Sequence, residues 1–349
     1  MNVLITGGAG FIGSAVVRLC LDKSLANVAV YDAMTYAANP QTIAPHAGRS
    51  DFRFFLRDIC DPAGVLAAFD EVRPDAVMHL AAESHVDRSI DAPAAFVQTN
   101  VLGTQVLLDA ALAYWRSLDA ERKARFRFHH ISTDEVFGSL GEDDYFHEGT
   151  RYDPRSPYSA SKAASDHLVR AWHHTFGLPV VLTNCTNNYG PFQFPEKLIP
   201  LLILRGLAGE KMPVYGDGRN VRDWLFVDDH AEALWQVLTH GRVGETYAVG
   251  GRAERRNIDV ANAIAGLLDE LSPARRPHTS LIQFVQDRPG HDRRYAMDCG
   301  KICRELNWMP RRSFEDGLRA TVQWYLHNRA WWEPILNASY RLERLGSAA

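Results

Sequence analysis

Tyr158 and Lys162 stand four positions apart, a spacing that places both side chains on one face of a helix. An ammonium group close to a phenol favours the phenolate. Lys162 is therefore expected to lower the pKa of Tyr158 and to make it a usable base near neutral pH. Because this spacing is common, the alternative is a pair on the surface of an ordinary helix.

Thr133, Asp134 and Glu135 directly follow an apolar run that is typical of a strand. Thr133 is suited to hydrogen-bond a hydroxyl that is being oxidised. Oxidation alone gives the two carboxylates nothing to do, but elimination of water next to a new ketone needs a base for the α-proton and an acid for the departing hydroxyl. In the alternative reading, Asp134 caps a turn and Glu135 faces solvent.

Glycines at positions 7, 10 and 13 follow the first apolar run and precede a helical stretch. Such glycines let the backbone turn tightly beside a pyrophosphate, which exposed N–H groups and the helix dipole then hold. Asp32 comes 19 positions after Gly13, at the end of the next strand, where a carboxylate accepts the ribose hydroxyls and repels a 2′-phosphate. We therefore expect NAD rather than NADP, although a glycine turn alone can be purely structural.

Further cofactor contacts are expected where the next strands end, as in open α/β sheets. For Asp58, a helix N-cap before Pro62 is an equally good interpretation. The expected cofactor site comprises Gly7, Gly10, Phe11, Ile12, Gly13, Asp32, Thr35, Asp58, Ile59, Leu80, Ala81, Ala82, Thr99, Tyr158 and Lys162.

Short apolar runs alternate with helical stretches in the first half of the chain, which predicts a doubly wound parallel sheet of the Rossmann type. Strands are expected at residues 3–6, 28–31, 52–56, 76–80, 126–132 and 180–184, and helices at 10–21, 62–69, 94–118 and 159–176. A return to the same sheet is expected through strands at 224–227 and 246–249 that flank a helix at 228–238.

The composition changes after Tyr189, where a segment rich in proline and aromatic residues begins. This change predicts a second and smaller α/β lobe that binds substrate. The predicted division is a cofactor domain at 1–189, with 220–250 returning to it, and a substrate lobe at 190–219 and 251–349.

The composition is that of an ordinary globular protein: 38 Lys and Arg against 42 Asp and Glu give a net charge of −4. This balance predicts no general affinity for nucleic acid or membranes. The N-terminus lacks a basic segment before its short apolar run, and five scattered cysteines give no ligand pattern, so we expect a cytoplasmic protein with reduced thiols and no metal.

Taken together, the glycine turn, the Tyr158–Lys162 pair and Thr133 point to an extended short-chain dehydrogenase/reductase. The sequence resembles the dTDP-glucose 4,6-dehydratases almost from end to end. The resemblance rests on residues 7–13, 35–37, 79–89, 132–136, 158–162, 187–191, 194–200, 216–218, 221–224 and 289–292. It departs from the family at Phe137, where a tyrosine is usual, and at Ala38, where a glycine is usual.

The resemblance implies a lyase of deoxysugar nucleotide synthesis, on routes such as that to dTDP-rhamnose and O-antigen. Tyr158, assisted by Lys162, would take the proton of the sugar 4-hydroxyl while hydride passes from C4 to NAD. Glu135 would then remove the C5 proton and Asp134 would protonate the leaving C6 hydroxyl. Hydride returns to C6, so NAD should stay bound through each cycle.

A sugar nucleotide carries about two negative charges on its diphosphate, and Arg222 and Arg288 are the cationic candidates for it. The resemblance implies that further residues bind the substrate, although a salt bridge or a surface role is the alternative for each. The expected set is Ser84, His85, Arg88, Thr133, Asn187, Glu196, Lys197, Arg222, Asn257, Arg288 and His291.

Three other functions remain open at this stage. A UDP-hexose 4-epimerase would not need Asp134 and Glu135, and a non-catalytic NAD sensor would not need Tyr158 and Lys162. A 4,6-dehydratase of another nucleotide hexose is harder to exclude, because the sequence does not display the pocket that reads the base.

A homodimer is expected through the helices at 94–118 and 159–176, which would pair across a two-fold axis. The apolar series in the first of these helices exceeds what one buried face needs. It consists of Phe96, Val97, Val101, Val106, Leu107, Leu108 and Leu112.

Overall fold

The computed structural model describes residues 1–338 of the chain. Within this range, seven parallel strands form the main sheet, in the order β10-β6-β5-β4-β1-β2-β3. These strands are β1 (Asn2–Thr6), β2 (Asn27–Asp32), β3 (Phe52–Leu56), β4 (Ala76–His79), β5 (Arg127–Thr133), β6 (Val180–Cys185) and β10 (Thr246–Val249). The doubly wound Rossmann-type sheet predicted from the sequence is confirmed.

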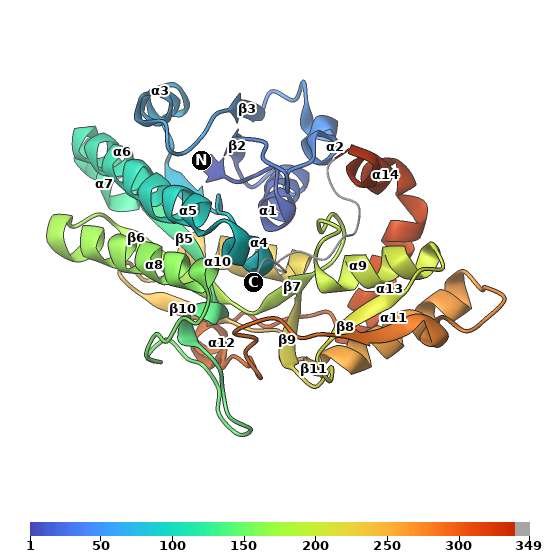
Figure 1. The fold of residues 1–349 in the computed structure, drawn as a ribbon. Helices are drawn as coiled ribbons and strands as arrows, with labels where there is room; N and C mark the ends of the chain where they lie inside the picture. The colour runs from blue at the N-terminus through green and yellow to red at the C-terminus, as the bar shows by residue number, and fades with distance from the viewer. Residues whose placement is uncertain (339–349) are drawn as a thin grey trace.

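Helices cover both faces of the main sheet (Figure 1). On one face, α1 (Phe11–Asp22) packs beside α10 (Val227–His240) over an apolar cluster that includes Val16 and Leu234. On the other face lie α3 (Pro62–Val72), α6 (Thr104–Ser117) and α8 (Pro157–Phe176), which share a second cluster. Because both faces are buried, the strands are apolar throughout rather than alternating.

The helix expected at 94–118 consists of three consecutive segments. These are α5 (Pro93–Phe96), a π-helical stretch, η2 (Val97–Gly103), and α6. A π-turn adds one residue per turn and shifts the facing side chains, so the apolar series does not form one stripe. Four of its members lie in the subunit's own core: Phe96, Leu107, Leu108 and Leu112. Val97 is 51% exposed, so part of the series lies outside this core, and the dimer contact expected there stays a prediction.

A second correction concerns the return of the chain to the main sheet. The strand expected at 224–227 is β9 (Val221–Phe226), which pairs with β7 (Asn187–Tyr189) and β11 (Glu254–Arg256) in a separate three-stranded sheet. Only α10 and β10 return. An apolar run identifies a buried strand but not its partner, and Trp224 and Phe226 are buried among aromatic side chains away from the main sheet.

A small-sheet region lies beside the main sheet, and it consists of β7, β9, β11, the pair β8 (Met212–Tyr215) and β12 (Ile282–Val285), and four helices. The helices are α9 (Leu198–Leu207), α11 (Asn257–Leu271), α13 (Phe314–His327) and α14 (Arg329–Ala338). They enclose an apolar core of their own. Part of the predicted substrate lobe, residues 339–349, lies outside the described residues.

Shorter elements complete the path between these units. They are α2 (Pro40–Ile43), η1 (Ala44–His46), α4 (Val86–Asp91), α7 (Ala120–Arg125), η3 (Asp134–Phe137), η4 (His278–Leu281) and α12 (Gly300–Leu306). Among residues 1–338, no helix combines the length and the apolar character that crossing a membrane requires.

Candidate active site

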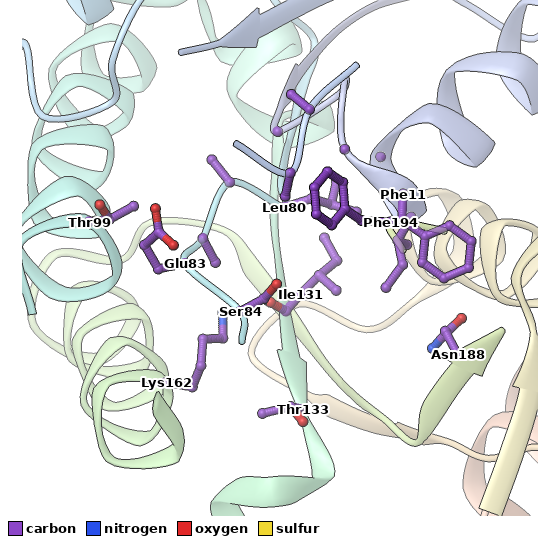
Figure 2. A pocket seen from close by; sticks show the side chains of 18 of the residues that line it. Phe11, Leu80, Glu83, Ser84, Thr99, Ile131, Thr133, Lys162, Asn188 and Phe194 are labelled. Atoms are coloured by element: carbon purple, nitrogen blue, oxygen red, sulfur yellow. Dashed lines mark hydrogen bonds between the residues drawn. The ribbon is translucent and has the colours of Figure 1, made fainter. Parts of the chain in front are cut away.

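A cavity of about 310 Å³ opens where the strands of the main sheet end, next to the small-sheet region. All fifteen residues of the expected cofactor site line it, as do Thr133, Asp134 and Glu135. Figure 2 shows Lys162 reaching from α8 towards Ile131, with Thr133 at the end of β5. The structure thus brings the predicted cofactor and catalytic residues to one place, while their roles stay predictions.

The glycine turn is closed too tightly for side chains. A Cβ at Gly13 would lie 2.1 Å from the carbonyl oxygen of Gly7. Gly7 itself has a left-handed φ of +72°, and a Cβ there would lie 2.6 Å from the backbone nitrogen of Ala81. Gly10, the N-cap of α1, has no capping side chain, and the first turn of the helix carries no acidic residue. The N–H groups of α1 therefore face the cavity free of side-chain competitors, which suits a diphosphate.

Asp32 ends β2 at the rim of this turn. Its Oδ2 accepts the backbone N–H of Ala9 at 2.9 Å, and its Oδ1 accepts that of Met34 at 2.8 Å. These bonds fix the carboxylate beside the glycine turn, and each oxygen keeps a lone pair for a ribose hydroxyl. The residues present therefore fit NAD.

The carboxylates that the sequence predicts to be catalytic are placed by a cap at the end of β5. Thr133 is the N-cap of η3, and its Oγ1 accepts the backbone N–H of Glu135 at 3.2 Å. Its hydroxyl also lies 3.3 Å from Oδ1 of Asp134. The sharp turn keeps Thr133, Asp134 and Glu135 on the cavity wall rather than in solvent.

Tyr158 and Lys162 are both buried in the first turns of α8, which begins with a capping box between Ser156 and Ser159. The expected effect of Lys162 on the tyrosine is wrong for this structure. Burial and then the charge of Glu135 raise the pKa of Tyr158 well above its ordinary value, against a hydrogen bond with Thr133 that lowers it. The Lys162 Nζ instead donates to the carbonyl oxygen of Ile131 at 2.9 Å.

The two carboxylates have different surroundings. Burial, followed by the charge of Glu135, raises the pKa of Asp134 well above its ordinary value, and its Oδ2 is buried without a hydrogen-bond partner. Burial also raises the pKa of Glu135, but the cations Arg288, Lys197 and Arg222 oppose that shift. Environments that push two carboxyl pKa values apart suit one acid and one base.

Four of the expected substrate residues line the same cavity, namely Ser84, Asn187, Glu196 and Lys197. Two of these are tied to other groups: Lys197 Nζ donates to the carbonyl oxygen of Ser84 at 2.9 Å, and Glu196 pairs with Arg88. The contacts join α4 to the segment before α9, so the cavity is closed on this side by expected substrate residues.

The remaining expected substrate residues do not line this cavity, and most of them are bound to other groups of the chain. Arg222 donates to the carbonyl oxygen of Asp292 at 2.9 Å, and Arg288 pairs with Asp87 at 3.0 Å. His291 binds Asp287 through Nδ1 at 2.6 Å. His85 caps α4, and Asn257 opens α11 with its Oδ1 buried and unpartnered. The structure does not place these five residues and Arg88 on the cavity wall.

Comparison with known proteins was made by sequence and by structure. The family model described as GDP-mannose 4,6 dehydratase matches residues 4–321. A dTDP-glucose 4,6-dehydratase of Neisseria meningitidis serogroup B is 58% identical over 99% of both chains. The chain belongs to the dTDP-glucose 4,6-dehydratase family. Its function is therefore that of an enzyme of the hydro-lyase type.

Solved structures of the family agree with this fold. The dTDP-glucose 4,6-dehydratase of Streptomyces venezuelae, crystallised with NAD bound, superposes with a TM-score of 0.88 at 45% identity over 96% of this chain and 100% of the other. A Thermus thermophilus UDP-glucose 4-epimerase with NAD is more distant, at 30% identity and a TM-score of 0.82 over 94% of this chain and 100% of the other.

The two departures of this dehydratase from the family pattern have simple surroundings. Phe137 is buried and packs with its ring centroid 5.2 Å from those of Phe146 and Tyr152. Ala38 does not have a left-handed φ, so alanine introduces no strain there.

Sequence reasoning missed several residues on the cavity wall of this dehydratase. They are Tyr31, Ala33, Ala37, Glu83, Ile131, Ser132, Cys185, Thr186, Asn188, Gln193 and Phe194. Most directly adjoin a predicted site residue, and the ends of neighbouring parallel strands meet at one edge. That rule could have identified Cys185, which ends β6, and Thr186, which follows it, whereas Gln193 and Phe194 come from an irregular segment without such a signal.

Proposed function

We propose that the enzyme converts dTDP-glucose to dTDP-4-keto-6-deoxyglucose and water. The observation that carries the proposal is the pair Asp134 and Glu135, held by one turn at the end of β5 on the wall that also bears Tyr158. An enzyme that only oxidises, or only epimerises at C4, has no use for this pair of carboxylates.

In the proposed reaction, Tyr158 takes the proton of the sugar 4-hydroxyl while Thr133 hydrogen-bonds the same oxygen. Burial disfavours the phenolate that this step needs, and the positive charge of bound NAD would favour it. Glu135 then removes the C5 proton, which the new C4 ketone has made acidic. Asp134 gives its proton to the C6 hydroxyl, and water leaves. Burial, which raises the pKa of Asp134, and the cations Arg288, Lys197 and Arg222, which oppose the rise in the pKa of Glu135, support these assignments.

NAD, when bound, supplies the acceptor that takes hydride from C4 and gives it back at C6, while Glu135 returns its proton to C5. The glycine turn with the N-terminus of α1 would hold its diphosphate, and Asp32 would bind the ribose hydroxyls and disfavour a 2′-phosphate. Because the nucleotide ends each cycle in its original state, we expect it to stay bound.

The sugar nucleotide would place its diphosphate near Lys197 on the cavity wall and near two cations that do not line it, Arg222 and Arg288. Three positive charges oppose the rise in the pKa of Glu135, which places them near the end of β5. They belong to Arg288, Lys197 and Arg222. Guanidinium groups match phosphate geometry. Asn187, Glu196, Asn257 and His291 are the further candidates for sugar and nucleotide contacts, with Ser84, His85 and Arg88 on the other side.

The test is to incubate the purified protein with dTDP-glucose and with UDP-, CDP- and GDP-hexoses in parallel. A 4-keto-6-deoxy product from dTDP-glucose alone supports the proposal. A 4-epimer without loss of water, or a faster reaction with another nucleotide, contradicts it. Chromatography of the extracted nucleotide should find NAD(H) rather than NADP(H).

We also propose a homodimer that forms through the outer faces of η2, α6 and α8. Val97 and Leu102 are large exposed apolar side chains on this face, and Phe176 is exposed at the end of α8. Replacing Val97 and Leu102 by Asp should give a monomer in light scattering, with Leu66→Asp on the exposed face of α3 as control. A monomeric parent at micromolar concentration contradicts the proposal.

A cytoplasmic location is the remaining part of the proposal. All five cysteines are free thiols, and Cys20, Cys185 and Cys299 are buried, which fits a reducing compartment.

A further inference from the structure

Asp166 is a buried carboxylate on α8, one helical turn after Lys162, and the proposed reaction steps do not use it. Four donors converge on it. Its Oδ1 lies 3.1 Å from Nε2 of His130, and its Oδ2 accepts Oγ of Ser132 at 2.9 Å, the hydroxyl of Tyr152 at 2.8 Å and Nδ2 of Asn184 at 3.4 Å.

These donors come from three parts of the molecule that meet at the catalytic end of the sheet. His130 and Ser132 belong to β5, Asn184 to β6, and Tyr152 to the segment before α8. Asn184 Nδ2 also donates to the carbonyl oxygen of Thr133 at 3.0 Å. Asp166 therefore ties α8, which bears Tyr158 and Lys162, to the strand end that bears Thr133.

The charge of Asp166 is not neutralised by its histidine partner. Burial, and then the charge of Lys162, lowers the pKa of His130 to about 4, so this ring is neutral at physiological pH. Burial on its own would raise the pKa of Asp166, but the hydrogen bonds from His130 and Ser132 and the charge of Lys162 together lower it. Arg170 does not bind Asp166 directly but donates to the hydroxyl of Tyr152 at 3.0 Å.

Lys162 in turn has few groups that favour its charged form. Burial lowers its pKa, whereas Asp166 and, to a smaller degree, Cys185 of β6 raise it. The other titratable groups that face it are His79 of β4 and His130 of β5, and burial keeps both neutral. Tyr158 shares its helix, and the pKa of Tyr158 is raised. Asp166 is thus the permanent anion beside this buried ammonium.

We propose that Asp166 is a positioning residue for the reaction: it locks the end of β5 against α8 and keeps Lys162 in its ammonium form. The inference rests on the proposed function, because it concerns the step that Tyr158 and Lys162 carry. A carboxylate that only stabilised the core would affect the amount of folded enzyme, but not the pH dependence of turnover per folded site.

The variant Asp166→Asn removes the charge and keeps the size. The hydroxyls of Ser132 and Tyr152 and the ring of His130 can each reverse their hydrogen-bonding role, so an amide can be accommodated. Ser132→Ala is the matched variant that removes one hydrogen bond and keeps the charge. Asp70→Asn, on the exposed surface of α3, is the control for loss of a carboxylate.

The measurement is kcat and KM for dTDP-glucose from neutral to alkaline pH, per site of folded, NAD-loaded enzyme. We expect Asp166→Asn to lower kcat by about 10- to 100-fold with little change in KM, as a small misplacement of reacting groups does. In the plot of kcat against pH for this variant, the fall in activity at alkaline pH (the alkaline limb) should begin about one pH unit or more lower. The reason is that the loss of an opposite charge near Lys162 lowers the pKa of its ammonium group. Ser132→Ala should lower kcat and leave the alkaline limb in place, and Asp70→Asn should change neither.

Two results overturn the inference. One is an Asp166→Asn enzyme whose kcat and alkaline limb match those of the parent. The other is a Ser132→Ala enzyme with the parent kcat, which decides the question even if Asp166→Asn does not fold. If the parent itself does not dehydrate dTDP-glucose, the proposed function fails instead, so the two failures are distinguishable.

Discussion

The Nε of Arg88 lies 2.9 Å from Oε2 of Glu196, and the two residues are 108 positions apart in the chain. The Arg88 guanidinium also lies over the ring of Tyr36, with its carbon 3.7 Å from the ring centroid, and the Tyr36 hydroxyl donates to Oε1 of Glu196 at 3.1 Å. The loop after β2, helix α4 and the segment before α9 are thereby joined at the edge of the cofactor cavity.

Glu196→Gln should therefore speed the loss of bound NAD. A hydrogen bond to a charged group contributes about 1.5 kcal/mol or more, which corresponds to about a tenfold change in a rate or equilibrium constant. The Glu196 side chain is 1% exposed, so water does not replace the lost contact. Release can be followed by nucleotide content after gel filtration at successive times.

The control for this experiment is Glu71→Gln, which breaks the pair of Glu71 with Arg53. That pair is 3.3 Å long, and both side chains are more than half exposed, so its loss should leave NAD release unchanged. Equal release from Glu196→Gln and Glu71→Gln would show that the Arg88 contact does not retain the cofactor.

Local sequence patterns predicted the parts of the site that one turn or one helix determines. The glycine turn needs only close backbone contacts between Gly7 and Gly13, and the shared face of Tyr158 and Lys162 follows from helical geometry. These residues lie where the sequence placed them. The Rossmann-type sheet was likewise predictable, because each buried parallel strand is continuous and apolar.

Long-range packing determined what the sequence did not predict. The pairing of Arg88 with Glu196 depends on how α4 meets the segment before α9, and the strand partner of Trp224 depends on the second core. The pKa of Tyr158 was mispredicted because spacing shows which groups are near but not how completely water is excluded. The π-helical stretch at Val97–Gly103 has no periodic signal of its own.

Gly13→Ala should damage the cofactor site and the fold together. The new Cβ would lie 2.1 Å from the carbonyl oxygen of Gly7, so the turn must open, and overpacking of this kind costs about 1 to 3 kcal/mol or more. We expect a lower denaturation midpoint and little bound NAD. Gly266→Ala, inside α11 with no atom within 4 Å of its Cβ, should instead stabilise the protein by about 0.5 to 1 kcal/mol. Equal midpoints for both variants would contradict this account.

Acid should destabilise the protein through buried neutral histidines. Burial lowers the pKa of His129 and of His230 to about 3, whereas an unfolded histidine titrates near about 6.5. Between these values the unfolded chain binds more protons. The contribution of each ring is therefore fully present above about pH 6.5 and is lost as the pH falls, by about 1.4 kcal/mol per pH unit.

His230→Leu tests this linkage, since both ring nitrogens of His230 are buried without partners. The slope of unfolding free energy against pH, measured by denaturant titration between about pH 6 and 4, should be smaller by about 1.4 kcal/mol per unit. His240→Leu, at an exposed position, should leave the slope unchanged. A parental slope in His230→Leu would mean that another group carries the acid sensitivity.

Variants of the two carboxylates should separate dehydration from oxidation. If Glu135 is the C5 base and Asp134 the acid for water loss, then Glu135→Gln and Asp134→Asn should still let hydride leave C4. Enzyme-bound NADH should then accumulate, visible by its absorbance, while product forms about 10² to 10⁴ times more slowly. Tyr158→Phe should abolish even the NADH signal, because the base for the 4-hydroxyl is lost.

The raised pKa of Asp134 makes the asparagine variant the sharper test, since the amide keeps the neutral charge of the protonated acid but has no acidic proton to give. If both carboxylate variants form product at the parent rate, Asp134 and Glu135 are structural, and the elimination must be carried by other groups on the cavity wall.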